Sequence, residues 1–365
     1  MIRPVLSSLP SYVPGGDDPQ GLKLSSNETT QGPLPGVVEA SARALAGTNR
    51  YPDASGVALR TTIAQWHGLD SSLPLTLDNV AVGTGSSALI QQAVLACCRG
   101  GDGVDGSTPD EVIYPWRSFE AYPIFAMVAG AKAVEIPLDA ELRNDLGAMA
   151  AAVTERTRLI IVCNPNNPTS TTVTRTELEI FLDSVPDHVH VLLDEAYFEY
   201  VRNEKSPDGL SLLDRYPNLA VARTFSKAFG LAGLRVGYLI GHPEFITAVN
   251  QVSIPFSVNS VAQAAAVASI EARRELLART DDTVAQRTRI LDRLPESLQG
   301  QAEANFVWLQ LGDRAREFAD ALAERHVVVR CFDGDGVRIT VTDEAETDAL
   351  LTALDVVGID DFARR

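Results

Sequence analysis

The feature that most constrains the fold is a regular alternation of short apolar strands with helical segments. Strands are expected at "VAVG" (80–83), "EVIYP" (111–115), "KAVEIP" (132–137), "RLIIVCNP" (158–165), "HVLLDEAY" (190–197), "AVARTFS" (220–226) and "VGYLIG" (236–241). Helical segments such as "RTELEIFLDSV" separate several of them. Buried strands that alternate with helices indicate an α/β fold with a mostly parallel central sheet.

The pattern changes after about residue 244. Long helical segments come first, and the expected strands "NFVWLQL" (305–311), "VVVR" (327–330) and "GVRITV" (336–341) then alternate with further helices, which indicates a smaller α+β domain. A chain of 365 residues is too long for one ordinary domain. We expect an N-terminal arm over residues 1–30 that belongs to the small domain, a large domain over 31–245 and a small C-terminal domain over 246–365.

The acidic excess argues against two classes of partner. The chain has 48 acidic and 31 basic residues and a net charge of -17, with no strong basic cluster, so we expect it to bind neither nucleic acid nor an anionic membrane. Prolines interrupt the start, "MIRPVLSSLPSYVPGG", and no stretch approaches the roughly 20 apolar residues of a membrane span. The four cysteines lack metal-site spacing, which predicts no metal and a cytoplasmic protein.

Polar residues follow four of the expected strands, where open α/β sheets bind ligands. In "VAVGTGSSALIQQ" a strand leads through glycines and serines into a helix, whose first backbone amides would hold a phosphate. Gly83, Gly85 and Ala88 also satisfy the dinucleotide fingerprint GxGxxG/A. An NAD-dependent oxidoreductase with Asp102 as its ribose acid, or a plain strand-to-helix turn, is therefore an alternative.

Two further strand ends carry polar residues that local structure would also explain. "CNPNNPTS" (163–170) combines prolines and asparagines, and turn chemistry alone accounts for such a run. In "LLDEAYFEY", Asp194 follows an apolar strand and Tyr197 lies three positions later. The aspartate would serve equally well as a helix cap.

The fourth strand end places Lys227 in the small and mostly apolar run "RTFSKAFGLAGLR" (223–235). A lysine among apolar neighbours is costly to bury as an ammonium ion, and desolvated lysines are candidates for Schiff-base chemistry. The alternative is a side chain that extends along the surface into water.

In their order and spacing these motifs resemble the fold-type I pyridoxal 5'-phosphate (PLP) aminotransferases, and among them the histidinol-phosphate aminotransferase subgroup. The resemblance runs from "LPSYVPG", "LSSNET" and "NRYPD" through "CNPNNPTS", "DEAY" and "TFSKAFGLAGLRVGY" to "ANFVW", "VVVR" and "GVRIT". "SNETTQGPLP", "PWRSFEAYP" and "RTFSKAFGLAGLR" are most similar to the actinobacterial aromatic amino acid (phenylalanine) aminotransferases. The resemblance implies the PLP-transferase fold of type I, with a large and a small domain.

The resemblance also implies a role for each group around the cofactor. Lys227 matches the lysine that forms an imine with PLP and then carries a proton, and Asp194 matches the partner of the ring nitrogen. Tyr197 and Asn167 match the pair that hydrogen-bonds the phenolic oxygen. The positions that match the phosphate contacts are Ser86, Ser87, Thr224, Ser226 and Arg235, together with Tyr51 of a neighbouring subunit, which implies a homodimer with shared sites.

Other matches concern the cofactor ring and the substrate. Phe119 matches the aromatic ring that stacks on the cofactor, and Trp116, Tyr122 or a plain core role for Phe119 are the alternatives. Arg338 matches the arginine that clamps the substrate α-carboxylate, a bidentate task that suits arginine. The remaining substrate-side matches are Arg330, Asn27 and Tyr12.

Two departures from the family pattern change no catalytic group. Ser170 stands where the Pro-Thr-Gly turn usually ends in glycine, and Ser86-Ser87 replaces an acidic residue in the phosphate loop. The second departure leaves open whether hydroxyls or only backbone amides contact the phosphate.

The resemblance predicts a transaminase that moves the amino group of phenylalanine, and also tyrosine, to 2-oxoglutarate. Histidinol-phosphate transamination is the nearest alternative, for which Arg330 would serve as an additional cation. The NAD-dependent oxidoreductase leaves Asp194, Tyr197, Lys227 and Arg235 unexplained. A PLP-binding regulator without catalysis is a further alternative, although 365 residues leave no length for the DNA-binding domain that we expect of one.

Overall fold

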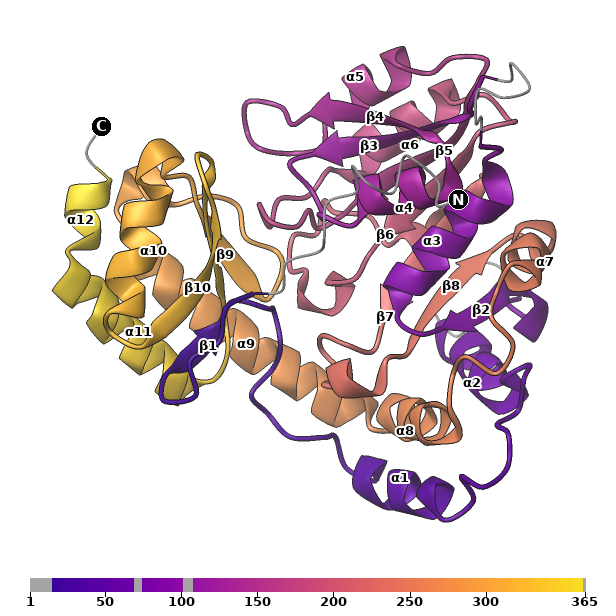
Figure 1. Cartoon of the computed structure of the whole chain (residues 1–365), viewed down its shortest axis with the longest axis horizontal. Helices are drawn as coiled ribbons and strands as arrows, with labels where there is room; N and C mark the ends of the chain where they lie inside the picture. Colours follow the sequence, from indigo (N-terminus) through magenta and orange to yellow (C-terminus); the bar gives the residue numbers. More distant parts are fainter. Residues whose placement is uncertain (1–14, 69–73, 101–107, 364–365) are drawn as a thin grey trace, which may run out of the picture.

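The computed structural model describes residues 15–68, 74–100 and 108–363, which form a large and a small part around separate sheets (Figure 1). The large sheet has 7 strands in the order β2-β8-β7-β6-β5-β3-β4. Neighbouring strands are parallel except for β8, which runs antiparallel to β2 and β7. The strands are β2 (Val80–Gly83), β3 (Glu111–Trp116), β4 (Lys132–Pro137), β5 (Thr157–Cys163), β6 (His190–Asp194), β7 (Leu219–Thr224) and β8 (Gly237–Gly241). The predicted fold class is confirmed.

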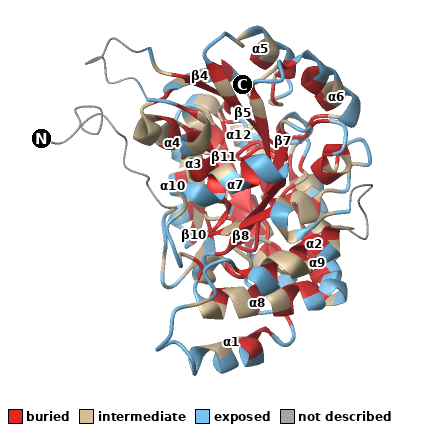
Figure 2. Ribbon diagram, turned by 90° about the vertical axis from the view of Figure 1, so that its right-hand side faces the viewer, coloured by how far each residue is buried: buried red, intermediate tan, exposed pale blue. Residues whose placement is uncertain are grey.

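Helices cover both faces of this sheet, which explains why its central strands are apolar along their whole length. In β5, Ile160 and Val162 face one core and Leu159 and Ile161 face the other, as the two-residue period of a strand requires. Figure 2 shows the buried strands between helices whose outer faces are exposed. The first core lies under α1 (Val37–Leu45), α2 (Val57–Gly68), α5 (Leu146–Ala151), α6 (Arg175–Ser184) and α8 (Ser260–Glu271), and the second under α3 (Ser86–Cys97), α4 (Tyr122–Ala129) and α7 (Pro243–Gln251).

The small sheet contains one strand from the N-terminal part of the chain and three from the C-terminal part. Its order is β1-β10-β11-β9, and β1 (Leu22–Leu24) lies parallel to β10 with Leu22 beside Val327. The sequence analysis did not identify β1, because three residues are too few for a periodic signal. The other strands are β9 (Phe306–Leu309), β10 (Val327–Phe332) and β11 (Gly336–Thr340), and the helices are α10 (Ala315–Ala323), α11 (Glu344–Val357) and α12 (Ile359–Phe362).

Helix packing bears on the expected boundary after residue 245, which falls inside α7. Helix α7 packs on α3 and β2, and α8 packs on α1 and α2, so both belong with the large sheet. The long helix α9 (Arg273–Arg293) spans the two parts (Figure 1), with Leu276 in the large core and Ile290 in the small one. We therefore propose a boundary within α9.

No helix among the described residues is long and apolar enough to cross a membrane.

Candidate active site

A cavity of about 190 Å³ opens where several strands of the large sheet end. Its walls come from the start of α3, the loop between β3 and α4, the carboxyl ends of β5, β6 and β7, and the loop that leads into β8. This is the edge at which open α/β sheets bind ligands. The lining residues are Ser86, Ser87, Phe119, Cys163, Asn167, Asp194, Ala196, Tyr197, Thr224, Ser226, Lys227 and Arg235. Apart from Cys163 and Ala196, the sequence analysis had selected every one of them.

Asp194 is the last residue of β6 and is buried. The Tyr122 hydroxyl donates a hydrogen bond to its Oδ2 at 2.7 Å, and the Ala196 backbone N–H donates to Oδ1 at 3.2 Å. Burial raises the pKa of Asp194 to about 6, while these hydrogen bonds and the nearby Lys227 act in the opposite direction. The carboxyl group is therefore a buried acid that a cation in the cavity would keep ionised.

Lys227 faces the cavity from the loop after β7. Desolvation, and after it the charge of Arg338, lower the pKa of its amine from 10.5 to about 7, so that about half of the amine is neutral near pH 7. Its Nζ donates to the Ser26 carbonyl at 3.2 Å and lies 5.7 Å from the centre of the Tyr197 ring. A neutral, positioned amine is a nucleophile and a proton acceptor.

Residues 25–27 contact the groups at one end of the cavity. Asn27 Nδ2 donates to the Tyr197 hydroxyl at 2.9 Å, and burial raises the pKa of Tyr197, so its phenol stays protonated. Arg338, in β11, donates to Asn167 Oδ1 and to the Ser25 carbonyl, both at 2.6 Å. The structure thus brings Asn27, Asn167, Tyr197 and Arg338 together, although they are far apart in the sequence.

The opposite end of the cavity forms an anion cradle. Ser86 and Ser87 begin α3, where free backbone N–H groups and the helix dipole favour negative charge. Arg235 Nη1 donates to Ser226 Oγ at 3.2 Å, and Thr224 Oγ1 donates to the same oxygen at 3.1 Å. Side-chain hydroxyls, backbone amides and one guanidinium therefore lie together at this end of the cavity.

A glycine keeps this cradle open. Gly85 has a φ of 86°, and a Cβ at this position would lie 2.6 Å from Arg235 Nη2. A larger residue would strain the backbone at this φ and would require the guanidinium to shift away from the start of α3.

Phe119 and Tyr122 have different places around the site. The Phe119 ring lines the cavity and meets the Tyr122 ring edge to face, with centroids 5.5 Å apart. Tyr122 is fully buried and points its hydroxyl at Asp194. The sequence analysis named Tyr122 only as an alternative stacking ring, and its hydrogen bond to Asp194 was missed.

A buried ion pair, also missed, ties the strand ends together beneath the site. Glu195 follows Asp194, and Arg223 precedes Thr224. Arg223 Nε and Nη2 donate to Glu195 Oε2 at 2.9 and 2.6 Å. The Gly209 N–H donates to the other carboxylate oxygen at 2.9 Å, so the charged group has several partners. This pair fixes the ends of β6 and β7 relative to each other.

Among the described residues selected from the sequence, Asn27, Arg338, Arg330 and Tyr51 are not part of the cavity wall, and of these Asn27 and Arg338 bond to the wall residues Tyr197 and Asn167. Arg330 lies in β10 and donates to Glu120 Oε2 at 2.7 Å. Tyr51 is 82% exposed and stacks on Phe256, with ring centroids 4.6 Å apart. Tyr12 lies outside the described residues, as does Asp102 of the oxidoreductase alternative.

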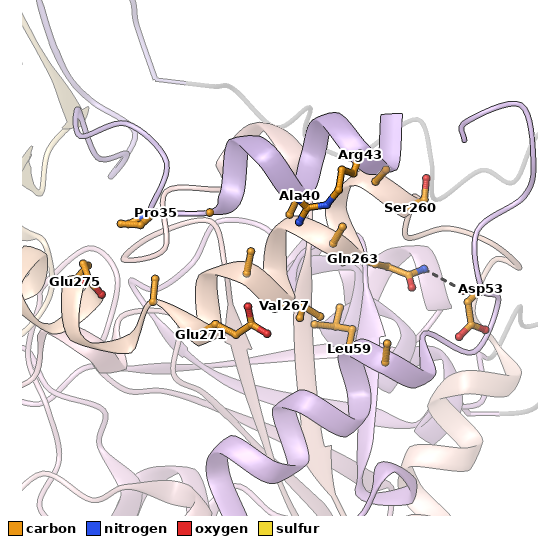
Figure 3. A pocket seen from close by; sticks show the side chains of 16 residues that line it. Pro35, Ala40, Arg43, Asp53, Leu59, Ser260, Gln263, Val267, Glu271 and Glu275 are labelled. Carbon is orange, nitrogen blue, oxygen red and sulfur yellow. Dashed lines mark hydrogen bonds between the residues drawn. The ribbon is translucent and has the colours of Figure 1, made fainter. Parts of the chain in front are cut away.

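A larger cavity of about 830 Å³ lies elsewhere, between α1, α2 and α8 (Figure 3). Apolar side chains such as Ala40, Leu59 and Val267 form its floor, and Gln263 Nε2 donates to the Asp53 carbonyl at 3.0 Å on its rim. None of the strand-end residues contributes to it. Its size does not make it the candidate site, because the strand-end residues Asp194, Tyr197 and Lys227, whose pKa values are shifted, line the smaller cavity.

A desolvated lysine, a buried aspartate and an anion cradle at the strand ends of this sheet define a PLP-dependent enzyme of fold type I. The family model described as "Aminotransferase class I and II" matches residues 19–354. The chain belongs to this aminotransferase family, and its cofactor is PLP.

Curated relatives are similar over nearly the whole chain. An aromatic amino acid aminotransferase of Corynebacterium jeikeium is 54% identical over 363 residues, which cover 97% of this chain and 93% of the relative. One of Rhodococcus opacus is 53% identical over 356 residues, or 96% and 94% of the two chains. Among solved structures, a histidinol-phosphate aminotransferase of Sinorhizobium meliloti in complex with PLP is 27% identical, with a TM-score of 0.85 and 99% and 98% coverage. The turn from Gly83 to Ala88 is thus part of an aminotransferase, and the oxidoreductase alternative is wrong.

Proposed function

We propose that the enzyme transfers the amino group of aromatic amino acids, phenylalanine and also tyrosine, to 2-oxoglutarate. The observation that carries the proposal is the identity of 50 to 54% to curated relatives that bear the name aromatic amino acid aminotransferase. The arrangement of Lys227, Asp194 and Arg338 supplies the groups that transamination needs. Its substrates are small amino and 2-oxo acids.

In this proposal Lys227 holds the cofactor and moves the proton. PLP supplies an aldehyde carbon that accepts amines and a ring that takes up the electron pair left when the substrate Cα loses its proton. Because desolvation brings the pKa of Lys227 to about 7, its released amine is largely neutral just above neutral pH and accepts the Cα proton at Nζ.

Asp194 would face the ring nitrogen and keep it protonated. Its carboxylate is held by Tyr122 and by the Ala196 N–H, so it meets a developing charge without reorganisation. Tyr197 and Asn167 would hydrogen-bond the phenolic oxygen, and Asn27 orients the Tyr197 hydroxyl. Phe119 would contact the flat face of the ring.

The anion cradle would bind the cofactor phosphate. Ser86 and Ser87 offer the N–H groups of the helix start, and Thr224, Ser226 and Arg235 add hydroxyls and a positive charge. Charge-assisted hydrogen bonds of this kind contribute roughly 1.5 to 3 kcal/mol each. Several of them would retain the cofactor while Lys227 is released.

Arg338 would clamp the substrate α-carboxylate. Its guanidinium is nearly buried, with 7% of the residue exposed, and Asn167 and Ser25 fix its orientation. Asn27, Arg330 and Tyr12 belong to the substrate side in the same proposal. A fixed, planar guanidinium matches the two oxygens of a carboxylate.

We also propose a homodimer in which Tyr51 reaches the cofactor phosphate of the partner subunit. Tyr51 does not line the cavity of its own chain and is highly exposed. The Phe256 ring, itself 42% exposed, stacks on the Tyr51 ring, and exposed apolar groups of this kind are typical of interfaces. The cytoplasmic location stays a prediction.

Histidinol-phosphate transamination is the second candidate function, and the likeness to the Sinorhizobium meliloti structure favours it. A comparison of kcat/KM for phenylalanine, tyrosine and histidinol phosphate, with 2-oxoglutarate as acceptor, separates the two. We expect the aromatic amino acids to be preferred by at least about tenfold, which corresponds to 1.4 kcal/mol in the transition state. Lys227→Ala, which removes the attachment of the cofactor, should abolish both visible absorption and turnover. A preference for histidinol phosphate would overturn the proposal.

A further inference from the structure

Two arginines lie side by side on the small sheet where it meets the candidate site. Arg330 in β10 and Arg338 in β11 are directly paired residues of antiparallel strands, so their side chains leave the same face of the sheet. Both guanidinium groups also approach the Phe332 ring, at 5.6 and 5.9 Å from its centre. A negatively charged substrate that reaches Arg338 therefore comes close to Arg330.

Among the described residues, the two arginines contact groups of different charge. Arg338 donates to two neutral oxygens, those of the Asn167 side chain and the Ser25 carbonyl. Arg330 donates to a carboxylate oxygen of Glu120 at 2.7 Å, and its side chain is only 14% exposed. The positive charge of Arg330 is thus met by a negative charge from the same protein.

Glu120 is next to the cavity wall in the chain, although it is not itself part of that wall. It directly follows Phe119, which lines the cavity, and its side chain is 33% exposed. Through its ion pair with Arg330, the strand partner of Arg338, the Glu120 carboxylate places a negative charge beside the pair of arginines.

We propose that the Glu120–Arg330 ion pair is a charge filter that admits an α-carboxylate at Arg338 and excludes a phosphate in its place. The inference rests on the proposed function, in which Arg338 holds the substrate anion. A carboxylate carries one negative charge, which Arg338 meets. A phosphate monoester carries about -1.5 to -2 charges near pH 7 and calls for a second cation.

Arg330 can serve as that second cation only if it leaves Glu120. The carboxylate would then remain next to the phosphate without its partner, and like charges at close range disfavour binding strongly. Glu120 thus weakens the binding of donors with a phosphate and adds nothing to the binding of donors with an α-carboxylate. Repulsion of the competing ligand is a common source of specificity.

Glu120→Gln tests the filter, because it removes the charge and keeps the shape. The reaction is followed as a half-reaction with donor alone, by the loss of visible absorption of the holoenzyme. The half-reaction needs no 2-oxoglutarate, whose own two negative charges would otherwise respond to the substitution. The donors are phenylalanine, histidinol phosphate and histidinol, the last differing from the second only by its phosphate. Relative to the wild type, we expect Glu120→Gln to raise the apparent second-order rate constant of the half-reaction about tenfold or more for histidinol phosphate. The same constant should change little for phenylalanine and histidinol.

Asp335→Asn is the matched control. Arg117 Nε donates to Asp335 Oδ2 at 2.7 Å. This second ion pair joins the loop between β3 and α4, which also contains Glu120, to the hairpin of β10 and β11, which also contains Arg330. If Glu120→Gln acted only by loosening the contact between the two parts, Asp335→Asn would change the preference in the same way, and the filter would be refuted. We expect Asp335→Asn to keep the wild-type preference.

The outcomes also separate this inference from the proposed function. If the wild type prefers phenylalanine and Glu120→Gln leaves histidinol phosphate unchanged, the filter is wrong and the proposed function stands. If the wild type itself prefers histidinol phosphate, both are wrong. Glu120→Asp, which retains the charge, should keep the exclusion of histidinol phosphate.

Discussion

The amine of Lys227 has the ordinary chemistry of an alkylamine but not its ordinary acidity. Desolvation and the charge of Arg338 oppose its protonation, so its pKa falls from 10.5 to about 7. The neutral form, which attacks an aldehyde, therefore becomes dominant above about pH 7 instead of above about pH 10. In the folded protein the charged form is the destabilised one.

We expect PLP to recombine with the apoenzyme faster as the pH rises through about 7 and to level off above about pH 8, because the neutral fraction then saturates. The rise of visible absorption after mixing measures this rate. Lys227→Ala serves as the control and should show no such absorption. A rate that keeps rising tenfold per pH unit up to about pH 10 would mean that the pKa of Lys227 is not lowered.

At the same scale, sequence reasoning selected most residues of the cavity because each follows a strand in a recognisable motif. It missed the hydrogen bond from Tyr122 to Asp194, which joins residues 72 positions apart. It also missed the Glu195–Arg223 pair, although both residues stand next to selected ones. Which side chains meet across a sheet depends on strand order, and a single sequence does not encode strand order as a local pattern.

At the scale of elements, the start of α3 decides whether the site can hold a phosphate. Gly85 adopts a positive φ, and the Arg235 guanidinium occupies the space beside its Cα. We expect Gly85→Ala to weaken PLP binding about tenfold or more, because both the backbone strain and the displaced guanidinium disturb the cradle.

Titration of the apoenzyme with PLP, followed by absorption, measures this effect. Gly233→Ala is the matched control, because Gly233 lies in the loop that leads to Arg235, has no positive φ and would meet nothing within 4 Å. An unchanged affinity in Gly85→Ala would show that the cradle tolerates a side chain and does not hold the phosphate as proposed.

The positions of most elements were predictable, and the exceptions have physical reasons. The strands of the large sheet match the apolar runs within three residues, because burial of the central strands on both faces leaves an unbroken signal. The role of α9 was not predictable. Its sequence predicts one amphipathic helix, and an amphipathic pattern does not indicate that Leu276 and Ile290 pack into different cores.

At the scale of the whole molecule, the proposed dimer makes a prediction about shared sites. If Tyr51 acts in the partner's site, Lys227→Ala and Tyr51→Ala subunits complement each other. A mixed dimer has one site with both residues intact and one site with neither. After random exchange of subunits we expect about a quarter of the wild-type activity, since half of the dimers are mixed and half of their sites are complete.

The measurement is transaminase activity before and after the two purified variants are mixed under conditions of subunit exchange. Each variant alone is its own control. Activity that stays at the sum of the separate variants would show that Tyr51 acts within its own chain or not at all.

The strand β1 has a consequence for the order in which the protein can fold as it is synthesised. Its backbone pairs with β10, and Asn27, three residues beyond it, bonds to Thr340, which lies 313 positions later. The ribosome therefore releases the partner of β1 only near the end of translation. The large sheet can form first, and until β10 has been synthesised residues 22 to 27 have no strand with which to pair. Because Ser25, Ser26 and Asn27 contact Arg338, Lys227 and Tyr197, these proposed site groups reach their final positions as one of the last events of folding.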